Sequence, residues 1–342
     1  MAIVVTGLTK TFRVHEKEPG LLGSVRGLFR RKYRDVPAVA GVSFRIDRGE
    51  LVGFLGPNGA GKTTTVKMLA GVLYPTSGSA SVLGHVPWHR QAAFLRRISL
   101  VLGQKNQLWW DLPPIESFRL QQAIYEIEEP VFRKRLAELV DLLDLTPLLD
   151  VQVRKLSLGE RMKCELAAAL LHGPEVLFLD EPTLGLDVVM QKRMRAFIRE
   201  YQRRHGATII LTSHYMDDVA ELCSRVIVID AGRVIYDGGL DELVRRHADY
   251  KTLTVSFASA VGRSALQDIG EVVSYDPHKA TLRVARDRVS SCAARLLDAF
   301  PVVDLAIQEA DLADIVREVF ASDGTGRPAR DVVSSRDGQW RE

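Results

Sequence analysis

The sequence predicts an α/β fold followed by a small α+β domain, and three observations support this. A short apolar run at 51–55, typical of a buried strand, leads through a glycine-rich loop into a segment at 64–70 with helical apolar spacing. Further apolar runs that end in polar residues stand at 98–103, 176–179 and 208–211. Beyond about residue 245, short alternating runs and one helical pattern follow, as in a small mixed domain.

Composition limits the classes of protein that this chain can represent. Its 342 residues suggest about two domains. Lys and Arg together number 46 against 43 for Asp and Glu, and the net charge of +3 is too small to indicate nucleic-acid binding. No apolar run approaches the roughly 18 to 20 residues needed to cross a bilayer, and the N-terminus lacks the pattern of a secretory signal. Cys164, Cys223 and Cys292 do not follow metal-ligand spacing, so we expect small buried side chains in a soluble cytoplasmic protein.

The strand at 51–55 leads into a phosphate-binding loop. Residues 56–63 fit the pattern G-x-x-x-x-G-K-[ST], in which glycines leave backbone N–H groups free to face phosphate oxygens. Lys62 is expected to reach the β- and γ-phosphates, and the Thr63 hydroxyl to ligate Mg²⁺. The following helix adds its positive N-terminal end. The nucleotide contacts expected here are Pro57, Asn58, Gly59, Ala60, Gly61, Lys62, Thr63 and Thr64.

A second group of polar residues follows the apolar strand at 176–179. Asp180 can hold the Mg²⁺ shell, and Glu181 can polarise the attacking water. Phosphoryl transfer requires both of these roles, positioning of the metal and orientation of the nucleophile. Two surface acids at a strand end would be an ordinary alternative. The continuation at 182–187, Pro-Thr-Leu-Gly-Leu-Asp, disfavours it.

With five further motifs, the chain resembles the nucleotide-binding subunit of an ATP-binding cassette (ABC) transporter. The motifs are Leu8–Phe12, Gln104, the signature Leu156–Arg161, the D-loop Leu184–Asp187 and Thr212–His214, all in family order within residues 2–240. The resemblance implies a P-loop NTPase of the ABC cassette type, with a mixed sheet core and a helical subdomain. It also implies ATP and Mg²⁺ as cofactors.

The resemblance further implies a head-to-tail dimer in which each ATP is covered by the signature of the other subunit. Ser157 and the Gly159 N–H would donate to the opposite γ-phosphate, and Asp187 would lie beside the same site. His214 would contact that phosphate, and Gln104 would join Thr63 and Asp180 around Mg²⁺. ATP binding would close the dimer, and hydrolysis would release it.

Three of these residues also have ordinary interpretations. His214 could be a histidine at a strand end, Gln104 a solvated loop amide and Phe12 a core aromatic rather than the ring that stacks on adenine. Their order among the other motifs favours the functional interpretation for all three.

The signature departs from the commonest family pattern at two positions, where Leu158 and Glu160 replace Gly and Gln. Ser157 and Gly159, which would face the phosphate, are kept. The charge of Glu160 near the γ-phosphate should weaken ATP binding unless Arg161 or Lys163 offsets it.

The segment between Gln104 and the signature has a mostly helical pattern at roughly 113–172, and we expect the helical subdomain to span about 105–172. In the family this part faces the membrane partner. Adjacent Trp109 and Trp110 cannot both point into one core, so either one is buried or both form a platform for a short helix of the partner. We favour the platform. This segment also resembles a bacterial subgroup linked to exporters of the ABC-2 type.

An insertion at about 14–37 mixes apolar and basic residues. Its apolar members Leu21, Leu22, Val25, Leu28 and Phe29 share one helical face. Such a stretch can lie on an anionic membrane or pack on the cassette, and glycines that weaken the helix favour packing slightly.

The cassette is expected to span residues 1–245, and a small α+β accessory domain residues 246–321. Alternation at 253–257 and 282–284 predicts strands, residues 289–300 follow a helical period, 302–307 form another strand, and a closing helix follows at 312–320. Residues 322–342 have no apolar period and are expected to be disordered.

The sequence thus predicts an ATPase that powers an ABC transporter, with export suggested by the subgroup resemblance. The expected partners are a separate polytopic membrane subunit and a second cassette, in a complex at the cytoplasmic face of the membrane. A soluble ABC ATPase acting on ribosomes or nucleic acid is the alternative, but such proteins usually carry two cassettes or a coiled-coil insertion. A cassette that only binds ATP is disfavoured by Asp180, Glu181 and His214.

Overall fold

The computed structural model describes residues 1–16, 32–103, 107–213, 215–247, 249–309, 312 and 314–316. The chain forms two compact units, residues 1–242 and 243–342. The division lies close to the boundary at residue 245 that the sequence suggests, and helix α9 (Leu240–His247) crosses it. None of the helices in the described part is long and apolar enough to cross a membrane.

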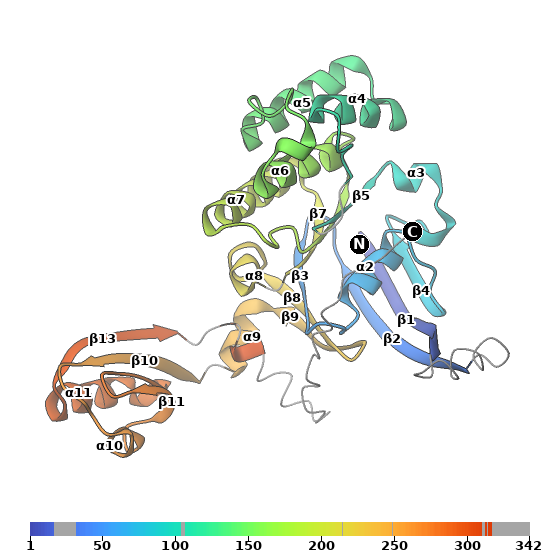
Figure 1. Cartoon of the computed structure of the whole chain (residues 1–342). Coiled ribbons are helices and arrows are strands. Elements are labelled where there is room, and N and C mark those ends of the chain that lie inside the picture. The colour runs from blue at the N-terminus through green and yellow to red at the C-terminus, as the bar shows by residue number, and fades with distance from the viewer. Residues whose placement is uncertain are drawn as a thin grey trace, which may run out of the picture. The chain divides into compact units, whose positions relative to one another are not determined.

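A six-stranded sheet forms the centre of the first unit, in the order β5-β6-β7-β3-β8-β9 (Figure 1). Neighbouring strands run parallel except for β8 and β9. The bounds are β3 (Leu51–Leu55), β5 (Ile98–Leu102), β6 (Val176–Asp180), β7 (Thr208–Thr212), β8 (Arg225–Asp230) and β9 (Arg233–Gly239). The apolar runs at 51–55, 98–103, 176–179 and 208–211 are confirmed as strands. They are nearly continuous in apolar residues because parallel strands are buried on both faces.

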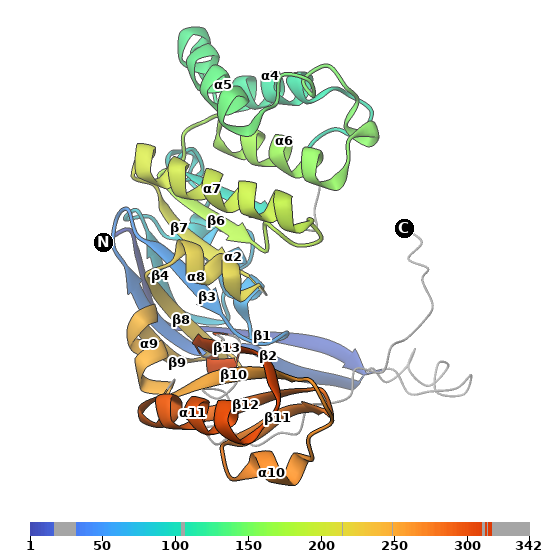
Figure 2. The ribbon, with the colours of Figure 1, turned by 90° about the vertical axis from the view of Figure 1, so that its left-hand side faces the viewer.

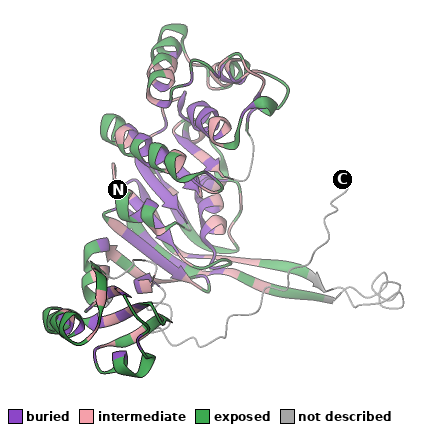
Figure 3. Cartoon of the chain, turned by 60° about the vertical axis from the view of Figure 1, so that its left-hand side comes forward, coloured by how far each residue is buried: buried purple, intermediate pink, exposed green. Residues whose placement is uncertain are grey.

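A second, antiparallel sheet has the order β2-β1-β4, with bounds β1 (Ile3–Glu16), β2 (Lys32–Ile46) and β4 (Ser77–Val82). Beyond Thr9, the last β1 residue paired with β4, β1 and β2 continue alone as a two-stranded ribbon whose outer part is largely exposed (Figure 3). Tyr33 and Arg34 belong to this ribbon, so the end of the insertion expected at about 14–37 is part of β2. Its apolar positions 21–29 lie outside the described residues.

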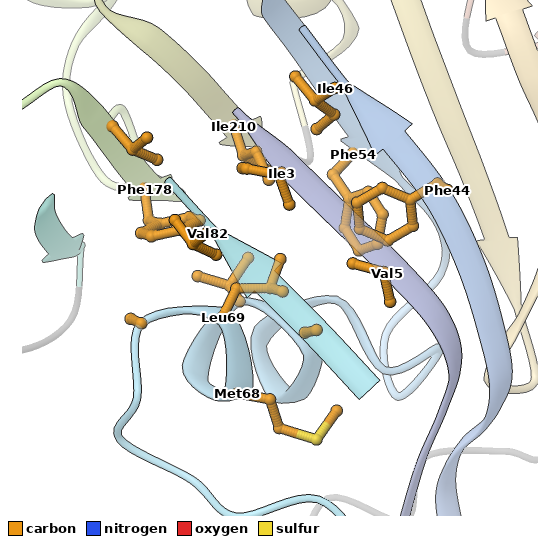
Figure 4. Packing of buried hydrophobic residues seen from close by; sticks show 14 of the residues in the cluster. Ile3, Val5, Phe44, Ile46, Phe54, Met68, Leu69, Val82, Phe178 and Ile210 are labelled. Atoms are coloured by element: carbon orange, nitrogen blue, oxygen red, sulfur yellow. The ribbon is translucent and has the colours of Figure 1, made fainter. Parts of the chain in front are cut away.

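One apolar cluster joins both sheets to α2 (Lys62–Leu69) (Figure 4). Met68 and Leu69 come from the helix, and the rings of Phe44 on β2 and Phe54 on β3 lie 5.6 Å apart between centroids. Because α2 directly follows the phosphate loop, burial of its apolar side fixes the position of that loop against the central sheet.

The helical segment expected at 113–172 is confirmed. It contains α4 (Pro114–Ile124), α5 (Glu129–Leu143) and α6 (Leu158–Leu170), which gather at one end of the unit, with α7 (Val188–His205) between them and the sheet (Figure 2). Proline in the first turn suits the starts of α4 and α5. The shorter helices of the unit are α3 (Ala92–Leu95), α8 (Met216–Leu222) and the 3₁₀ turns Pro87–His89 and Val153–Lys155.

The second unit is an α+β domain, as the sequence predicts. Its antiparallel sheet has the order β11-β12-β10-β13, and α11 packs on one face (Figure 2). The bounds are β10 (Tyr250–Phe257), α10 (Arg263–Gln267), β11 (Glu271–Asp276), β12 (Lys279–Ala285), the 3₁₀ turn Arg286–Arg288, α11 (Val289–Ala299) and β13 (Val302–Glu309). β11 and α10 were not predicted, because β11 is mostly exposed and α10 is a single turn and a half. Residues 312 and 314–316 are helical, and the rest of the closing helix and the tail lie outside the described residues.

All three cysteines are buried and free, which confirms the expectation of small buried side chains. Burial raises the pKa of the Cys164 thiol to about 12, so this thiol is protonated and unreactive at neutral pH.

Candidate nucleotide-binding and hydrolysis site

The parallel strands deliver the predicted site residues to one edge of the central sheet. In the strand register, Asp180 at the end of β6 pairs with Leu102 of β5 and with Thr212 of β7, and Thr212 pairs with Phe54 of β3. The loops that leave these strands therefore begin side by side, at the edge where parallel α/β sheets bind ligands.

The phosphate loop has a conformation that its glycines require. Gly61 has a φ of 102°, and a Cβ atom there would lie 2.4 Å from the carbonyl oxygen of Ala38. Gly61 also stands at the N-cap of α2 and offers no side-chain hydrogen bond to the first turn, whereas Ser157 and Asp187 cap α6 and α7. The first turn of α2 can therefore serve an anion.

Lys62 lies almost completely buried over this loop. Its Nζ donates hydrogen bonds to the carbonyl oxygens of Gly56 at 2.6 Å and Pro57 at 3.1 Å. Burial lowers the pKa of Lys62, while the charges of Glu181 and Asp180 act in the opposite direction and favour the ammonium form. Lys62 thus lies between the carbonyl oxygens of the loop and two carboxylates.

Thr63 and Asp180 meet directly beside that lysine. The Thr63 hydroxyl donates to Asp180 Oδ2 at 2.9 Å, and the Thr212 hydroxyl donates to Asp180 Oδ1 at 2.6 Å. A hydroxyl beside a carboxylate is a donor set that fits Mg²⁺. No group of three or more His, Cys, Asp or Glu side chains within the described ranges could hold a metal by itself.

Glu181 follows in a strained backbone conformation. Its φ of 56° is left-handed, which costs a non-glycine residue roughly 1–3 kcal/mol. The Glu181 N–H donates to the carbonyl oxygen of Thr212 at 3.0 Å, which ties the residue to β7. Such strain concentrates at functional sites, where neighbouring structure holds it in place.

Gly103 connects β5 to the same corner. Its N–H donates to the carbonyl oxygen of Asp180 at 2.9 Å, and a Cβ atom there would lie 2.2 Å from the carbonyl oxygen of Glu181. Only glycine permits this approach. Gln104 and His214 lie outside the described residues, but their neighbours Gly103 and Ser213 directly follow β5 and β7, the strands on either side of β6.

The signature forms the start of α6, where Glu160 bonds mainly to Ser157 rather than to Arg161 or Lys163. Ser157 is exposed, its hydroxyl donates to Glu160 Oε2 at 2.8 Å, and its N–H donates to the same oxygen at 2.9 Å. These two hydrogen bonds lower the pKa of Glu160. Lys163 lowers that pKa further, but Arg161 lies over the Trp110 ring at 5.3 Å instead. The main partner of Glu160 is therefore Ser157 itself, in a capping box.

The signature packs against the D-loop of its own chain. A Cβ atom on Gly159 would lie 3.0 Å from Met190 Cγ, and one on Gly185 would lie 3.0 Å from Leu158 Cδ2. Asp187 caps α7 by accepting a hydrogen bond from the Met190 N–H at 2.9 Å. Apolar side chains stand exposed around this contact, namely Leu158, Val188 and Val189.

Phe12 lies on the β1–β2 ribbon with 38% of its surface exposed, and Lys10 Nζ stands 5.3 Å from the ring centroid. Its interpretation as a core aromatic is therefore wrong. The ring is available for stacking.

Trp109 and Trp110 are both exposed, at 58% and 46%. The interpretation that buries one of them is therefore wrong. The segment is anchored by its neighbours, because Leu108 is buried and Asp111 pairs with Arg154 at 3.1 Å.

Glu165 on α6 is a buried acid that sequence reasoning missed. Its carboxylate accepts hydrogen bonds from the backbone N–H groups of Gln107, at 2.9 Å, and Leu108, at 3.2 Å. Burial raises the pKa of Glu165, and the two amides oppose that shift. The tryptophan segment is thereby bonded to the helix that begins with Ser157.

Residues 39–184 match the family described as ABC transporter, and residues 249–308 match the domain described as EvrA-like ABC transporter, C-terminal domain. The chain is 35% identical over 215 residues to the ABC transporter ATP-binding protein NatA of Bacillus subtilis, which covers 63% of this chain and 87% of that protein. It is 37% identical over 226 residues to the Nod factor export ATP-binding protein I of Ralstonia nicotianae, which covers 65% of this chain and 68% of that protein.

A solved structure described as the ATP binding subunit of an ABC transporter aligns with a TM-score of 0.59 and 25% identity. The alignment covers 72% of this chain and 93% of that one. Together with the phosphate loop and the Asp180–Glu181 corner, these likenesses show that the chain belongs to the family of ABC transporter ATP-binding proteins and is an ATPase of that family.

Proposed function

We propose that this chain is the ATP-hydrolysing subunit of an ABC exporter, working as a head-to-tail dimer with a separate membrane-spanning subunit at the cytoplasmic face. The observation that carries the proposal is the contact of Thr63 with Asp180 beside Lys62 and Glu181. It supplies, at one sheet edge, a cation for the phosphates, oxygen ligands for Mg²⁺ and a carboxylate for water.

The chemistry is hydrolysis of the bond between the β- and γ-phosphates. The first turn of α2 and Lys62 bind the phosphate oxygens, with the loop residues from Pro57 to Thr64 around them. Thr63 and Asp180, with Gln104, would hold Mg²⁺, which neutralises the charge shared by the β- and γ-phosphate oxygens. Glu181 orients a water and takes its proton as the water oxygen bonds to the γ-phosphorus, and ADP and phosphate leave.

The dimer is supported by the surface around the signature. Ser157, which is exposed, would meet the γ-phosphate of a second copy, and the exposed Leu158, Val188 and Val189 would be covered in that contact. Gly159 and Asp187 of one copy would complete the site of the other. His214, which follows β7, the strand beside Asp180, would contact the γ-phosphate from the chain that holds the phosphate loop, and Phe12 would stack on adenine. A second copy is the simplest partner because each chain carries both halves of such a site.

Docking of the membrane subunit is proposed at the exposed pair Trp109 and Trp110. Exposed aromatics are favoured anchors in interfaces, and both rings belong to a segment bonded to α6. A cavity of about 300 Å³ lies beside it and is lined by Gln107, Tyr125 and His172 among others. Export is the proposed direction because the similar protein of Ralstonia nicotianae is named for export.

Co-purification tests the transporter assignment. The tagged chain should bring a polytopic membrane protein in stoichiometric amount from membranes solubilised in mild detergent. Replacing Trp109 and Trp110 by Ala should abolish this recovery and leave the ATPase rate of the isolated chain unchanged, whereas Tyr74→Ala, at an exposed aromatic elsewhere, should keep the partner. Recovery with ribosomes or nucleic acid alone would contradict the proposal.

A further inference from the structure

A buried carboxylate on α8 joins the loop after β6 to the loop after β7. Asp218 is completely buried (0% exposed), and its Oδ2 accepts a hydrogen bond from the Ser213 hydroxyl at 2.7 Å and another from the Thr183 hydroxyl. Its Oδ1 accepts a hydrogen bond from Arg195 Nη1 at 2.9 Å. All three donors are themselves buried.

The two hydroxyls come from the two loops that border the hydrolysis corner. Thr183 stands two residues after the strained Glu181, and Ser213 directly follows Thr212, whose carbonyl oxygen accepts the Glu181 N–H. Asp218 Oδ2 therefore connects Thr183, on the C-terminal side of Glu181, to Ser213 at the end of β7. On its N-terminal side, Glu181 directly follows β6, which holds that side in place.

A role in stability alone explains these contacts less well. Arg195 has a second acidic neighbour, Glu221, whose Oε1 lies 3.1 Å from Arg195 Nε at a partly exposed position. If Asp218 served only to neutralise Arg195, its Oδ2 would not need to accept hydrogen bonds from the hydroxyls of both loops. A glutamate with a left-handed backbone conformation, by contrast, keeps that conformation only where several surrounding contacts hold it in place.

We propose that Asp218 is a positioning residue for hydrolysis, which locks Thr183 to Ser213 and thereby holds Glu181 in its left-handed conformation toward the attacking water. The inference rests on the proposed role of Glu181. The proposal assigns no contact with ATP to Asp218. Its hydrogen bonds to Thr183 and Ser213 therefore affect the rate of the chemical step and not the affinity for ATP.

The test compares Thr183→Val, which keeps the shape of the side chain but removes the hydroxyl, with Thr183→Ser, which keeps the hydroxyl. The valine variant should lose at least about tenfold in kcat, with the Kd for ATP within about twofold of wild type, and the serine variant should recover most of the rate. Ser213→Ala should reproduce the loss and serves if the valine variant does not fold. Glu221→Gln, which touches Arg195 but neither loop, should keep the wild-type rate.

A double variant shows whether the lock acts through Glu181. Adding Thr183→Val to Glu181→Gln should cause no further loss of turnover, because both changes remove the same function. A lower melting temperature with unchanged kcat in Thr183→Val and Ser213→Ala would overturn the proposal. If Glu181→Gln alone hydrolyses ATP at the normal rate, the proposed role of Glu181 is wrong. A slow Thr183→Val variant would then show that the hydrogen bonds to Asp218 position a different group.

Discussion

Ser157 and Glu160 show how one substitution can change a binding group. The sequence predicted that Glu160 would act as a charge near the γ-phosphate. In the structure its carboxylate accepts hydrogen bonds from the hydroxyl and the N–H of Ser157, and this hydroxyl is the group expected to donate to the γ-phosphate. In the proposed dimer, the ATP bound to the other copy would therefore have to displace Glu160 from Ser157, in addition to overcoming its charge.

We predict that Glu160→Gln favours the ATP-bound dimer. The amide keeps the capping geometry but removes the charge. Hydrogen bonds to charged groups contribute about 1.5–3 kcal/mol and those to neutral groups about 0.5–1.5 kcal/mol, a difference of roughly 1–1.5 kcal/mol, so the ATP concentration for half-dimerisation should fall roughly fivefold to tenfold. Sedimentation across an ATP titration measures it. Glu128→Gln, at an exposed acid that makes no side-chain cap for α5, should leave the titration unchanged, and an unchanged Glu160→Gln curve would count against competition for Ser157.

The hydrolysis corner was largely predictable from single residues, because Lys62, Thr63, Asp180 and Glu181 stand in motifs tied to strand ends. The supporting residues were not. Glu165 and Asp218 lie in helical stretches where an acid usually faces solvent, and their roles depend on hydrogen-bond donors from distant segments. Only the fold brings those donors together.

Among the elements, the junction of α4, α6 and β5 contains a buried histidine. His172, just after α6, stacks on Tyr125 with ring centroids 4.0 Å apart, and its Nε2 donates to the carbonyl oxygen of Ile98 at 2.9 Å. The pKa of His172 is lowered from 6.5 to about 4, mainly by burial and also by nearby Arg135, while the hydrogen bond to Ile98 opposes the shift. The histidine is therefore neutral in the folded chain at neutral pH.

This junction should weaken in acid. Because the folded pKa lies below the unfolded one, the contribution is complete above pH 6.5 and is lost as the pH falls toward 4, by at most about 1.4 kcal/mol per pH unit. Chemical denaturation at pH 7 and pH 5 should show a smaller loss for His172→Gln than for wild type. His89→Gln, at an exposed position, is the control, and equal losses in His172→Gln and wild type would contradict the assignment.

Helices and strands were predicted correctly where the apolar residues follow a strong period, and were missed where pairing with a distant strand determines the conformation. The parallel strands and α4 to α6 follow their apolar patterns. The outer part of β1 and β2 is stabilised by pairing between the two strands, which the mixture of apolar and basic residues at about 14–37 did not reveal. Trp109 and Trp110 are exposed because the buried Leu108 and the contact of Glu165 with the backbone already anchor their segment.

On the scale of the whole molecule, the proposed function gives each chain only part of an ATP site. The phosphate loop, Asp180 and Glu181 lie at one edge of the central sheet, whereas Ser157 begins a helix in the helical part of the same unit (Figure 1). A second copy would bring its own Ser157 to the bound nucleotide and cover the exposed Val188 and Val189. The proposed assembly therefore joins two cassettes through ATP, with hydrolysis as the step that separates them.

The most direct test of this account measures turnover and ATP-dependent dimerisation of Glu181→Gln in the same preparation. The amide keeps the shape of the side chain but cannot accept the proton of the attacking water, so turnover should fall by about a hundredfold or more while ATP still binds. The unhydrolysed ATP should then hold the chain as a stable dimer that wild type forms only transiently. Hydrolysis at the wild-type rate, or ATP binding without any dimer, would contradict the account.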